Sequence, residues 1–414
     1  NIMAIVKPFS AIRPAASVAK QVAALPYDVY NRKEACDIVS QNPLSFLAID
    51  RAETQFEDSV HTYDPRVYQK ANELLQKRIQ EGIFITDSEQ CYYIYEQTMN
   101  QRTQTGLVAC CSIDDYANGV IRRHENTRAE KEADRIHHVD ACNAQTGPIF
   151  LAYRSNSTIN EIIYHEKQSL PIYDFLSDDG IRHTVWKVSN SDSIHRLEVA
   201  FQKISHTYIA DGHHRAASAV HVGFDRRIAH PNYTGQEELN YFLSVLFPDD
   251  ELFILPYNRV VKDLAGLTTE QFLSILCKKF LVTAKSNAVI PSHKGSFGMF
   301  LNNQWYQLDL LPQFFSNDPI KGLDVSLLNE YILSPILKIG DLRTDQRIDF
   351  IGGIRGTEEL ERRCHTDMKV AFSMYPTSIQ ELFAVADSGK LMPPKSTWFE
   401  PKLRSGLFIH SIQE

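Results

Sequence analysis

The feature that most constrains the fold is a short apolar run that passes directly into a polar turn and then into small residues. Residues 208–210 (Tyr-Ile-Ala) predict the end of a buried strand, and residues 211–215 read Asp-Gly-His-His-Arg. Residues 216–220 (Ala-Ala-Ser-Ala-Val) favour a helix that packs closely on its sheet and ends near Gly223. Glycine allows a sharp turn between the two elements. The sequence therefore predicts a strand, a tight turn and a helix.

Such a turn has the properties of an anion site. The free amides at the start of a helix, and the positive end of its dipole, favour phosphate. Two imidazoles and a guanidinium, from His213, His214 and Arg215, follow Gly212 in the same first turn. The alternative is structural, because Asp before a helix is also a common N-cap.

Elsewhere, strand and helix patterns mix without a regular strand–helix–strand repeat. Examples are a predicted strand over residues 45–49, a helix over 65–81, a charged helix over 128–143 and a helix over 325–337. This mixture predicts an α/β or α+β protein with mixed sheets. We divide the chain into an N-terminal α+β region (1–100), a core with the Asp-Gly-His-His-Arg turn (101–235) and a C-terminal α+β domain (236–414).

Composition bears mainly on partners and location. The formal net charge is −8 and the isoelectric point about 6.0. This acidic balance argues against nucleic-acid binding, because contact with the phosphate backbone needs a basic surface. The seven cysteines include no Cys-x-x-Cys pair, which fits reduced thiols in the cytoplasm. The sequence contains no long apolar run, so we expect no signal peptide and no membrane-spanning helix. A homo-oligomer is compatible with this composition.

A second polar cluster precedes the turn in the chain. His124 and Glu125 lie between Arg122, Arg123 and Arg128. A carboxylate among cations stays ionised at neutral pH and can accept a proton from a hydroxyl group. The alternative is a solvated ion pair with a neighbouring arginine.

Two further stretches are candidates for ligand binding. His138 and Asp140 lie on the predicted charged helix, and imidazole and carboxylate both suit divalent ions. A polar helix face is the structural alternative. Residues 393–398 (Pro-Pro-Lys-Ser-Thr-Trp) could close over a ligand, with Lys395 as a point charge on phosphate, or could simply pack the C-terminal segment.

Asp211-Gly212-His213-His214-Arg215, followed by a helix of small residues, resembles the nucleotide-binding signature of the ParB/sulfiredoxin superfamily. It is most similar to the form in that group's free serine kinases. The whole chain resembles a bacterial family of unknown function, the domain-of-unknown-function-1015 family. The stretches that carry this second resemblance are residues 25–29 (Leu-Pro-Tyr-Asp-Val), 42–46 (Asn-Pro-Leu-Ser-Phe), 124–128 (His-Glu-Asn-Thr-Arg), 138–140 (His-Val-Asp) and 393–399 (Pro-Pro-Lys-Ser-Thr-Trp-Phe).

The resemblance implies a ParB/sulfiredoxin-like core and a cytoplasmic kinase that uses ADP or ATP with Mg²⁺ to phosphorylate a small hydroxylated metabolite. Glu125 would be the general base, assisted by His124, and Asp211 would shape the turn or assist the metal. The phosphates would contact Gly212, His213, His214, Arg215, Arg128 and Lys395, and the metal candidates are Asp211, His138 and Asp140.

Two alternatives stay open. The first is a non-catalytic nucleotide-binding regulatory protein of the ParB type. The second is a metal-dependent hydrolase built on His124, His138, Asp140, His213 and His214.

Overall fold

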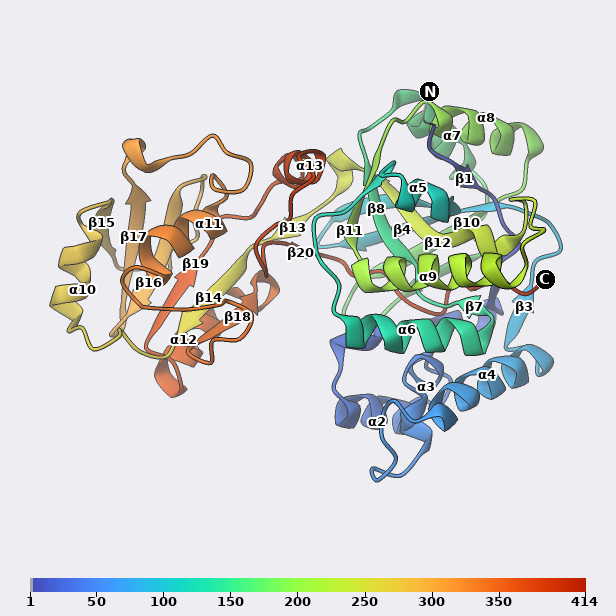
Figure 1. Cartoon of the computed structure of the whole chain (residues 1–414), viewed down its shortest axis with the longest axis horizontal. Helices are drawn as coiled ribbons and strands as arrows, with labels where there is room; N and C mark the ends of the chain where they lie inside the picture. The colour runs from blue at the N-terminus through green and yellow to red at the C-terminus, as the bar shows by residue number, and fades with distance from the viewer. Residues whose placement is uncertain (1–2) are drawn as a thin grey trace. The chain divides into compact units, whose positions relative to one another are not determined.

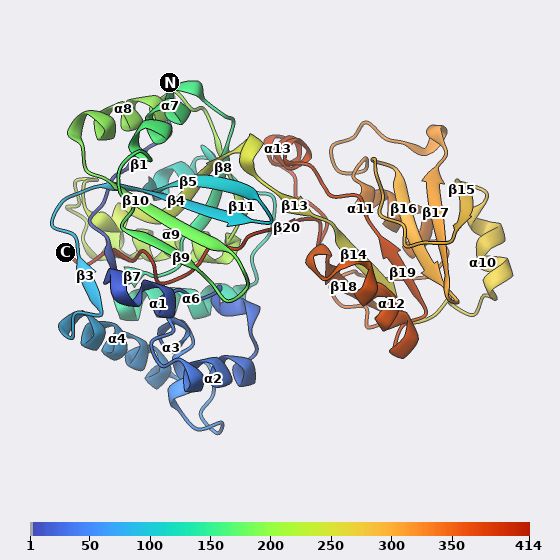
Figure 2. The same cartoon turned by 180° about the vertical axis from the view of Figure 1, so that it is seen from behind.

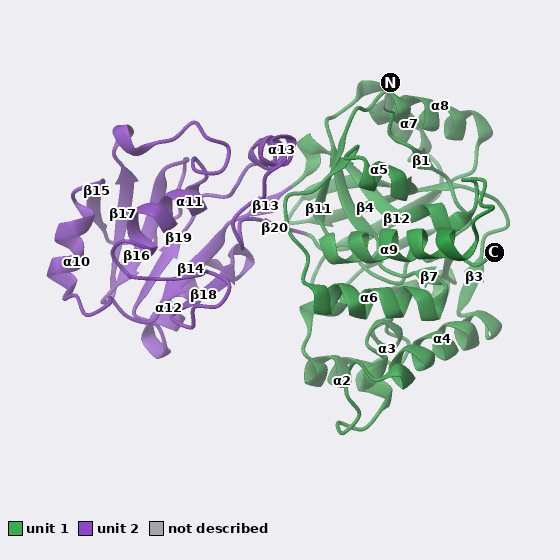
Figure 3. Cartoon of the chain, in the orientation of Figure 1, with its two compact units in different colours: residues 1–252, 401–414 green, residues 253–400 purple. Residues whose placement is uncertain are grey.

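The structure of the protein is a computed structural model that describes residues 3–414. The chain forms two compact units (Figure 3). Unit 1 comprises residues 1–252 and 401–414, and unit 2 comprises Phe253–Glu400.

These units divide the chain differently from the expected regions 1–100, 101–235 and 236–414. Strands β4 (Tyr92–Met99) and β5 (Arg102–Ser112) pair with each other across the expected first boundary. Strand β12 (Tyr241–Pro248) lies beyond the expected second boundary but pairs with β5 in the same sheet. Backbone pairing between distant segments sets the units, and turn signals in the sequence do not report it.

Unit 1 is built on a nine-stranded sheet. Its order is β6-β11-β8-β12-β5-β4-β10-β9, and β1 pairs with β5. The strands not yet bounded are β1 (Val6–Lys7), β6 (Ile121–Arg122), β8 (Ile149–Tyr153), β9 (Tyr173–Leu176), β10 (Arg182–Val188) and β11 (Thr207–Asp211). The pairs β6–β11 and β8–β12 are parallel and the other pairs are antiparallel, which confirms the predicted mixed sheet.

Helices cover this sheet and make its centre fully buried. All residues of β8 and β12 are buried, as expected for strands covered on both faces. Helices α7, α8 and α9 contribute side chains to the core around these strands, and α6 packs beside α9 (Figures 1 and 2). The helices in this part of unit 1 are α5 (Ile113–Ala117), α6 (Ala129–Cys142), α7 (Ser157–Glu166), α8 (Ser191–Gln202) and α9 (His213–Ala229).

A second core lies among the N-terminal helices of unit 1. These are α1 (Ala19–Val22), α2 (Arg32–Gln41), α3 (Leu47–Asp50) and α4 (Pro65–Gln80), joined by the strand pair β2 (Ile12–Pro14) and β3 (Phe84–Thr86). The predicted strand over residues 45–49 is wrong, because Leu47–Asp50 form a helical turn. All of its side chains are buried, and a short apolar run does not distinguish a buried strand from a buried helix.

The C-terminal segment returns to unit 1 after unit 2. Its strand β21 (His410–Ser411) pairs with β7 (Ala144–Gln145), which follows α6 directly. This return places residues 401–414 beside elements that are more than 150 positions earlier in the chain.

Unit 2 contains an antiparallel six-stranded sheet with the order β15-β17-β16-β19-β14-β18. Its strands are β14 (Tyr257–Val261), β15 (Phe280–Lys285), β16 (Ser296–Leu301), β17 (Gln304–Leu310), β18 (Ile348–Gly352) and β19 (Val370–Ser373), with the separate pair β13 (Ile254–Leu255) and β20 (Trp398–Phe399). Its helices are α10 (Thr269–Leu276), α11 (Asp324–Leu328), α12 (Gly356–Thr366) and α13 (Ile379–Asp387). The helix predicted over 325–337 is shorter, since α11 passes into a π-helix over Asn329–Leu333.

Within residues 3–414, no helix has both the length and the apolar composition that a membrane crossing requires.

Candidate functional site

The structure forms the strand, turn and helix that the sequence predicts around Gly212. Asp211 ends β11, Gly212 has a φ of 91° in the left-handed region, and α9 begins at His213. Such a φ favours glycine strongly. The predicted end near Gly223 is wrong, because the helix continues to Ala229. Gly223 allows close packing instead, since a Cβ there would lie 2.6 Å from the carbonyl oxygen of Leu239.

The loop that carries Glu125 reaches this turn because two strands run in the same direction. Strand β6 pairs in parallel with β11, with Ile121 opposite Thr207. The chain therefore leaves both strands at the same edge of the sheet. Residues 123–128 connect β6 to α6 at that edge and lie against the start of α9.

The two histidines of the turn hold this loop at both ends. The backbone N–H of His124 donates to Nε2 of His213 (3.4 Å), and that of Arg128 donates to Nε2 of His214 (3.0 Å). A ring nitrogen that accepts a hydrogen bond carries no proton, so both neutral rings are protonated at Nδ1. His213 and His214 therefore hold the loop of residues 123–128 in place, a role that the sequence pattern did not indicate.

Glu125 faces the remaining nitrogen of His213. Its Oε2 lies 3.4 Å from His213 Nδ1. The Glu125 side chain is 47% exposed, whereas that of His213 is 3% exposed. Burial, and the neighbouring His124, lower the pKa of His213 well below its usual value, so the ring stays neutral at pH 7. The carboxylate is thus held beside the turn and remains open to a solute.

His124 lies under the loop rather than in solvent. Its ring meets that of His213 edge to face, with the centroids 4.5 Å apart. Burial lowers its pKa to about 4, although the nearby Asp211 opposes this change. A neutral, buried ring is suited to support Glu125 through packing.

We predict that His213→Leu lowers the free energy of unfolding by about 1–3 kcal/mol, because the buried N–H of His124 loses its acceptor. His214→Leu should cost less, since Arg128 is exposed and its amide can bond to water. Urea unfolding of both variants and the parent checks this order. Equal losses for the two variants would contradict the proposed role of His213.

Asp211 forms the acidic part of the turn. Its Oδ1 accepts a hydrogen bond from the amide of Gly212 (2.9 Å), and Nζ of Lys402 lies 3.3 Å from its Oδ2. Burial alone would raise the pKa of Asp211, but Lys402 and Arg215 outweigh that effect and lower it to about 2. The carboxylate is therefore ionised at neutral pH.

This lowered pKa predicts a pH-dependent contribution to stability. The contribution is present at neutral pH and is lost as the pH falls from about 3.8 towards 2, because the unfolded chain takes up the proton first. Asp211→Asn should remove this step, so the stability difference between parent and variant should shrink in that range. Denaturant unfolding at several pH values measures it, and a difference that is independent of pH would contradict the assignment.

Arg215 folds back over the turn. Its Nη1 donates to the carbonyl oxygen of Pro148 (2.8 Å). A Cβ placed on Gly212 would lie 3.0 Å from Arg215 Nη2. Gly212 therefore serves two needs at once: the left-handed backbone, and the close approach of a guanidinium to the turn.

The structure gives the other predicted site residues separate contacts. His138 is buried and donates from Nε2 to the carbonyl oxygen of Ile49 (3.0 Å), whereas Asp140 is exposed and pairs with Arg226 (3.2 Å). They point away from each other because positions two apart on a helix do not share a face. In the described part of the chain, no group of three His, Cys, Asp or Glu side chains could hold a metal ion. Lys395 belongs to unit 2, where its ammonium lies 5.7 Å from the ring centre of Tyr257.

Lys402 is the site residue that sequence reasoning missed. It reaches Asp211 only because the C-terminal segment returns to unit 1. The sequence offers one weak signal, since residues 393–399, just before it, are among the stretches that carry the family resemblance.

Comparison with solved structures finds proteins of low identity. A glutamate-to-glutamine variant of a free serine kinase in complex with AMP is 12% identical and has a TM-score of 0.35, with 73% of this chain and 92% of that chain covered. A glutamate-to-alanine variant in complex with ADP is 13% identical, with a TM-score of 0.34 and coverage of 74% and 93%. SbnI with a C-terminal truncation, from Staphylococcus aureus, is 11% identical, with a TM-score of 0.36 and coverage of 71% and 84%.

No curated protein sequence matches the chain. The DUF1015 family, whose description is "Protein of unknown function", matches residues 6–326. Because this match covers more than half of the chain, the protein belongs to the DUF1015 family.

Proposed function

We propose that the protein is a nucleotide-dependent kinase that phosphorylates a hydroxyl group of a small metabolite. The observation that carries this proposal is the position of Glu125, whose carboxylate lies 3.4 Å from His213 on a loop held by both histidines of the turn. General-base catalysis requires a carboxylate that is fixed in place and still accessible to substrate. The Asp-Gly-His-His-Arg turn, similar to that of free serine kinases, supports the same activity.

The turn itself would hold the nucleotide phosphates. The first amides of α9 follow a left-handed Gly212, and Arg215 lies against the same glycine. Backbone amides at a helix start, together with a guanidinium, suit phosphate oxygens. His214, protonated at Nδ1, and the exposed Arg128 would add donors.

In the proposed reaction, the substrate hydroxyl oxygen attacks the terminal phosphorus of ATP or ADP. A new P–O bond forms, and the bond between that phosphorus and the leaving nucleotide breaks with its electron pair left on the nucleotide. Glu125 accepts the hydroxyl proton. Arg215 balances negative charge on the phosphates.

In this proposal Mg²⁺ would be shared between the protein and the nucleotide phosphates. Mg²⁺ usually keeps several waters and binds through one or two carboxylates plus substrate phosphate. Asp211, which is ionised and lies in the turn, would hold it, and the ion would neutralise phosphate charge when bound.

The test is to incubate the full chain with ATP or ADP, Mg²⁺ and a panel of hydroxylated amino acids and sugars, and to follow product by ³¹P NMR. Calorimetry with each nucleotide gives binding separately. Phosphorylated product is expected with at least one acceptor. If no product forms and no nucleotide binds, the proposal fails, whereas binding without product would favour the regulatory alternative.

A further inference from the structure

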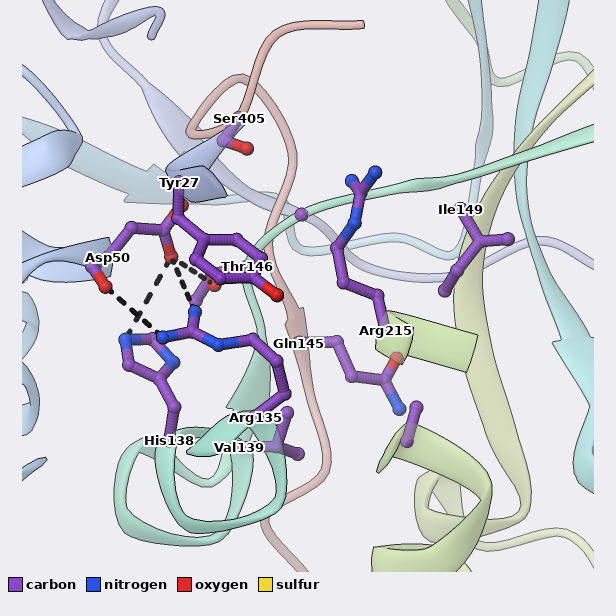
Figure 4. A pocket seen from close by; sticks show the side chains of 12 residues that line it. Tyr27, Asp50, Arg135, His138, Val139, Gln145, Thr146, Ile149, Arg215 and Ser405 are labelled. Atoms are coloured by element: carbon purple, nitrogen blue, oxygen red, sulfur yellow. Dashed lines mark hydrogen bonds and ion pairs between the residues drawn. The ribbon is translucent and has the colours of Figure 1, made fainter. Parts of the chain in front are cut away.

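A cavity behind Arg215 is bordered by several residues that the proposed reaction has not used (Figure 4). We call it the Asp50 cavity. Asp50 from α3, Arg135 and His138 from α6 and the ring of Tyr27 lie on one side, and Arg215 lies on the other. Its volume of about 20 Å³ is room for one water-sized group.

A larger hollow adjoins the Asp50 cavity. It has a volume of about 200 Å³ and shares four lining residues with it: Tyr27, Asp50, Arg135 and His138. Asp28 and Lys131 also line it, and Lys131 lies in the first turn of α6, directly after residues 123–128. The hollow therefore extends towards the loop that carries Glu125.

The carboxylate of Asp50 is buried without a hydrogen-bonded cation. The residue is 5% exposed, and Thr146 Oγ1 donates to its Oδ1 (2.9 Å). Arg135 Nη1 and His138 Nε2 are 3.8 and 3.9 Å from the same oxygen, too far for hydrogen bonds. Among residues 3–414, no side chain or amide donates to Oδ2.

The nearby cations are engaged elsewhere. Arg135 pairs with Asp134 (2.8 Å), and its guanidinium lies 3.9 Å from the ring centre of Tyr27. His138 donates its Nε2 proton to Ile49, and burial, together with Arg135, lowers its pKa, so it stays neutral. A buried carboxylate is costly unless it is paired and fully hydrogen-bonded. The ion-pair contact of Asp50 with Arg135 is long, so its carboxylate can still accept hydrogen bonds from an external cation.

We infer that the Asp50 cavity binds the protonated primary amine of a small hydroxylated metabolite, with the rest of that molecule in the larger hollow. An ammonium group is close to water in size and carries three donors, which suits Asp50 Oδ2 and the hydroxyl oxygens of Thr146 and Tyr27. A carboxylate would instead be repelled by Asp50 and would find Arg135 already paired.

The location of the cavity links this ligand to the proposed reaction. Arg215 forms both a wall of the Asp50 cavity and the end of the turn proposed to hold phosphates. The metabolite that carries the bound amine would therefore accept the phosphoryl group on its hydroxyl oxygen, an assignment that rests on the proposed function. Binding of the amine by Asp50 does not depend on it.

The probe for the amine site is ethanolamine, titrated calorimetrically into the full chain, with ethylene glycol and potassium chloride as comparisons. Ethanolamine should bind and ethylene glycol should not, since only the first carries an ammonium group. Asp50→Asn should weaken binding about 10- to 150-fold, the effect of losing a hydrogen bond to a charged group. Asp58→Asn, an exposed carboxylate in the same unit, should leave it unchanged.

Gly147→Ala keeps every charge and reduces the space. Its Cβ would lie 3.3 Å from Ser405 Oγ and 3.4 Å from the Arg215 side chain, so it should also weaken binding if the cavity is the site. This variant decides the question if Asp50→Asn fails to fold. The inference is overturned if ethanolamine does not bind, if ethylene glycol or K⁺ binds equally well, or if Gly147→Ala has no effect.

Phosphorylation assays separate this inference from the proposed function. If ethanolamine binds only when Asp50 is present and no amine-bearing acceptor gives a phosphorylated product, the amine site is supported and the kinase proposal fails. Product formation whose KM for amine acceptors is unchanged in Asp50→Asn would retain the kinase and overturn the inference.

Discussion

Replacing Glu125 with glutamine is expected to lower kcat of the phosphoryl transfer by about 100- to 10,000-fold, the usual contribution of a general base. Glutamine keeps the shape of the side chain but cannot accept the hydroxyl proton. The loop should stay in place, because His213 and His214 hold it through the backbone amides of His124 and Arg128. Nucleotide affinity should therefore change little, and the loss should fall on kcat.

The matched control is Glu161→Gln, an exposed glutamate on α7 that the proposed site does not use. Initial rates with a saturating acceptor, and calorimetric nucleotide binding, separate the two effects. If Glu125→Gln retains full activity, another group takes the proton. If it loses nucleotide binding as strongly as activity, Glu125 acts in ground-state binding and the proposed role is wrong.

The local part of the site could be predicted from sequence because it depends on local geometry. An apolar strand end, a glycine and a run of small residues suffice to predict a strand, a left-handed turn and a helix at Gly212. Expecting Glu125 close to the turn needed the resemblance as well. Strand β6, which brings it there, has only two residues and leaves no periodic pattern.

The rest of the site depends on pairing across long stretches of chain. Lys402 reaches Asp211 from 191 positions away, and Asp50 meets Thr146 across 96 positions. No local pattern reports such contacts. Residue type also gave only part of the role of His213 and His214: the sequence suggested phosphate ligands, and the structure adds that each uses Nε2 to accept a hydrogen bond from a backbone amide of the loop. An imidazole in a turn can accept a hydrogen bond from the protein backbone as readily as it can donate one to an anion.

Gly212→Ala tests whether the turn binds the nucleotide through the close approach of Arg215. Two effects are expected. The left-handed backbone, with a φ of 91°, costs any other residue about 1–2 kcal/mol of stability. In addition, the new Cβ would lie 3.0 Å from Arg215 Nη2 and displace the guanidinium. Loss of its charge-assisted bond to phosphate should weaken nucleotide binding about 10- to 150-fold.

Gly235→Ala separates these two effects. Gly235 has a φ of 93°, and a Cβ there would meet no atom within 4 Å. It should therefore show the same loss of stability in urea unfolding and normal nucleotide binding by calorimetry. If both alanine variants bind nucleotide equally well, Arg215 does not act through this turn. If only Gly212→Ala loses affinity, the contact between glycine and guanidinium is what the turn requires, because backbone strain is matched in the pair.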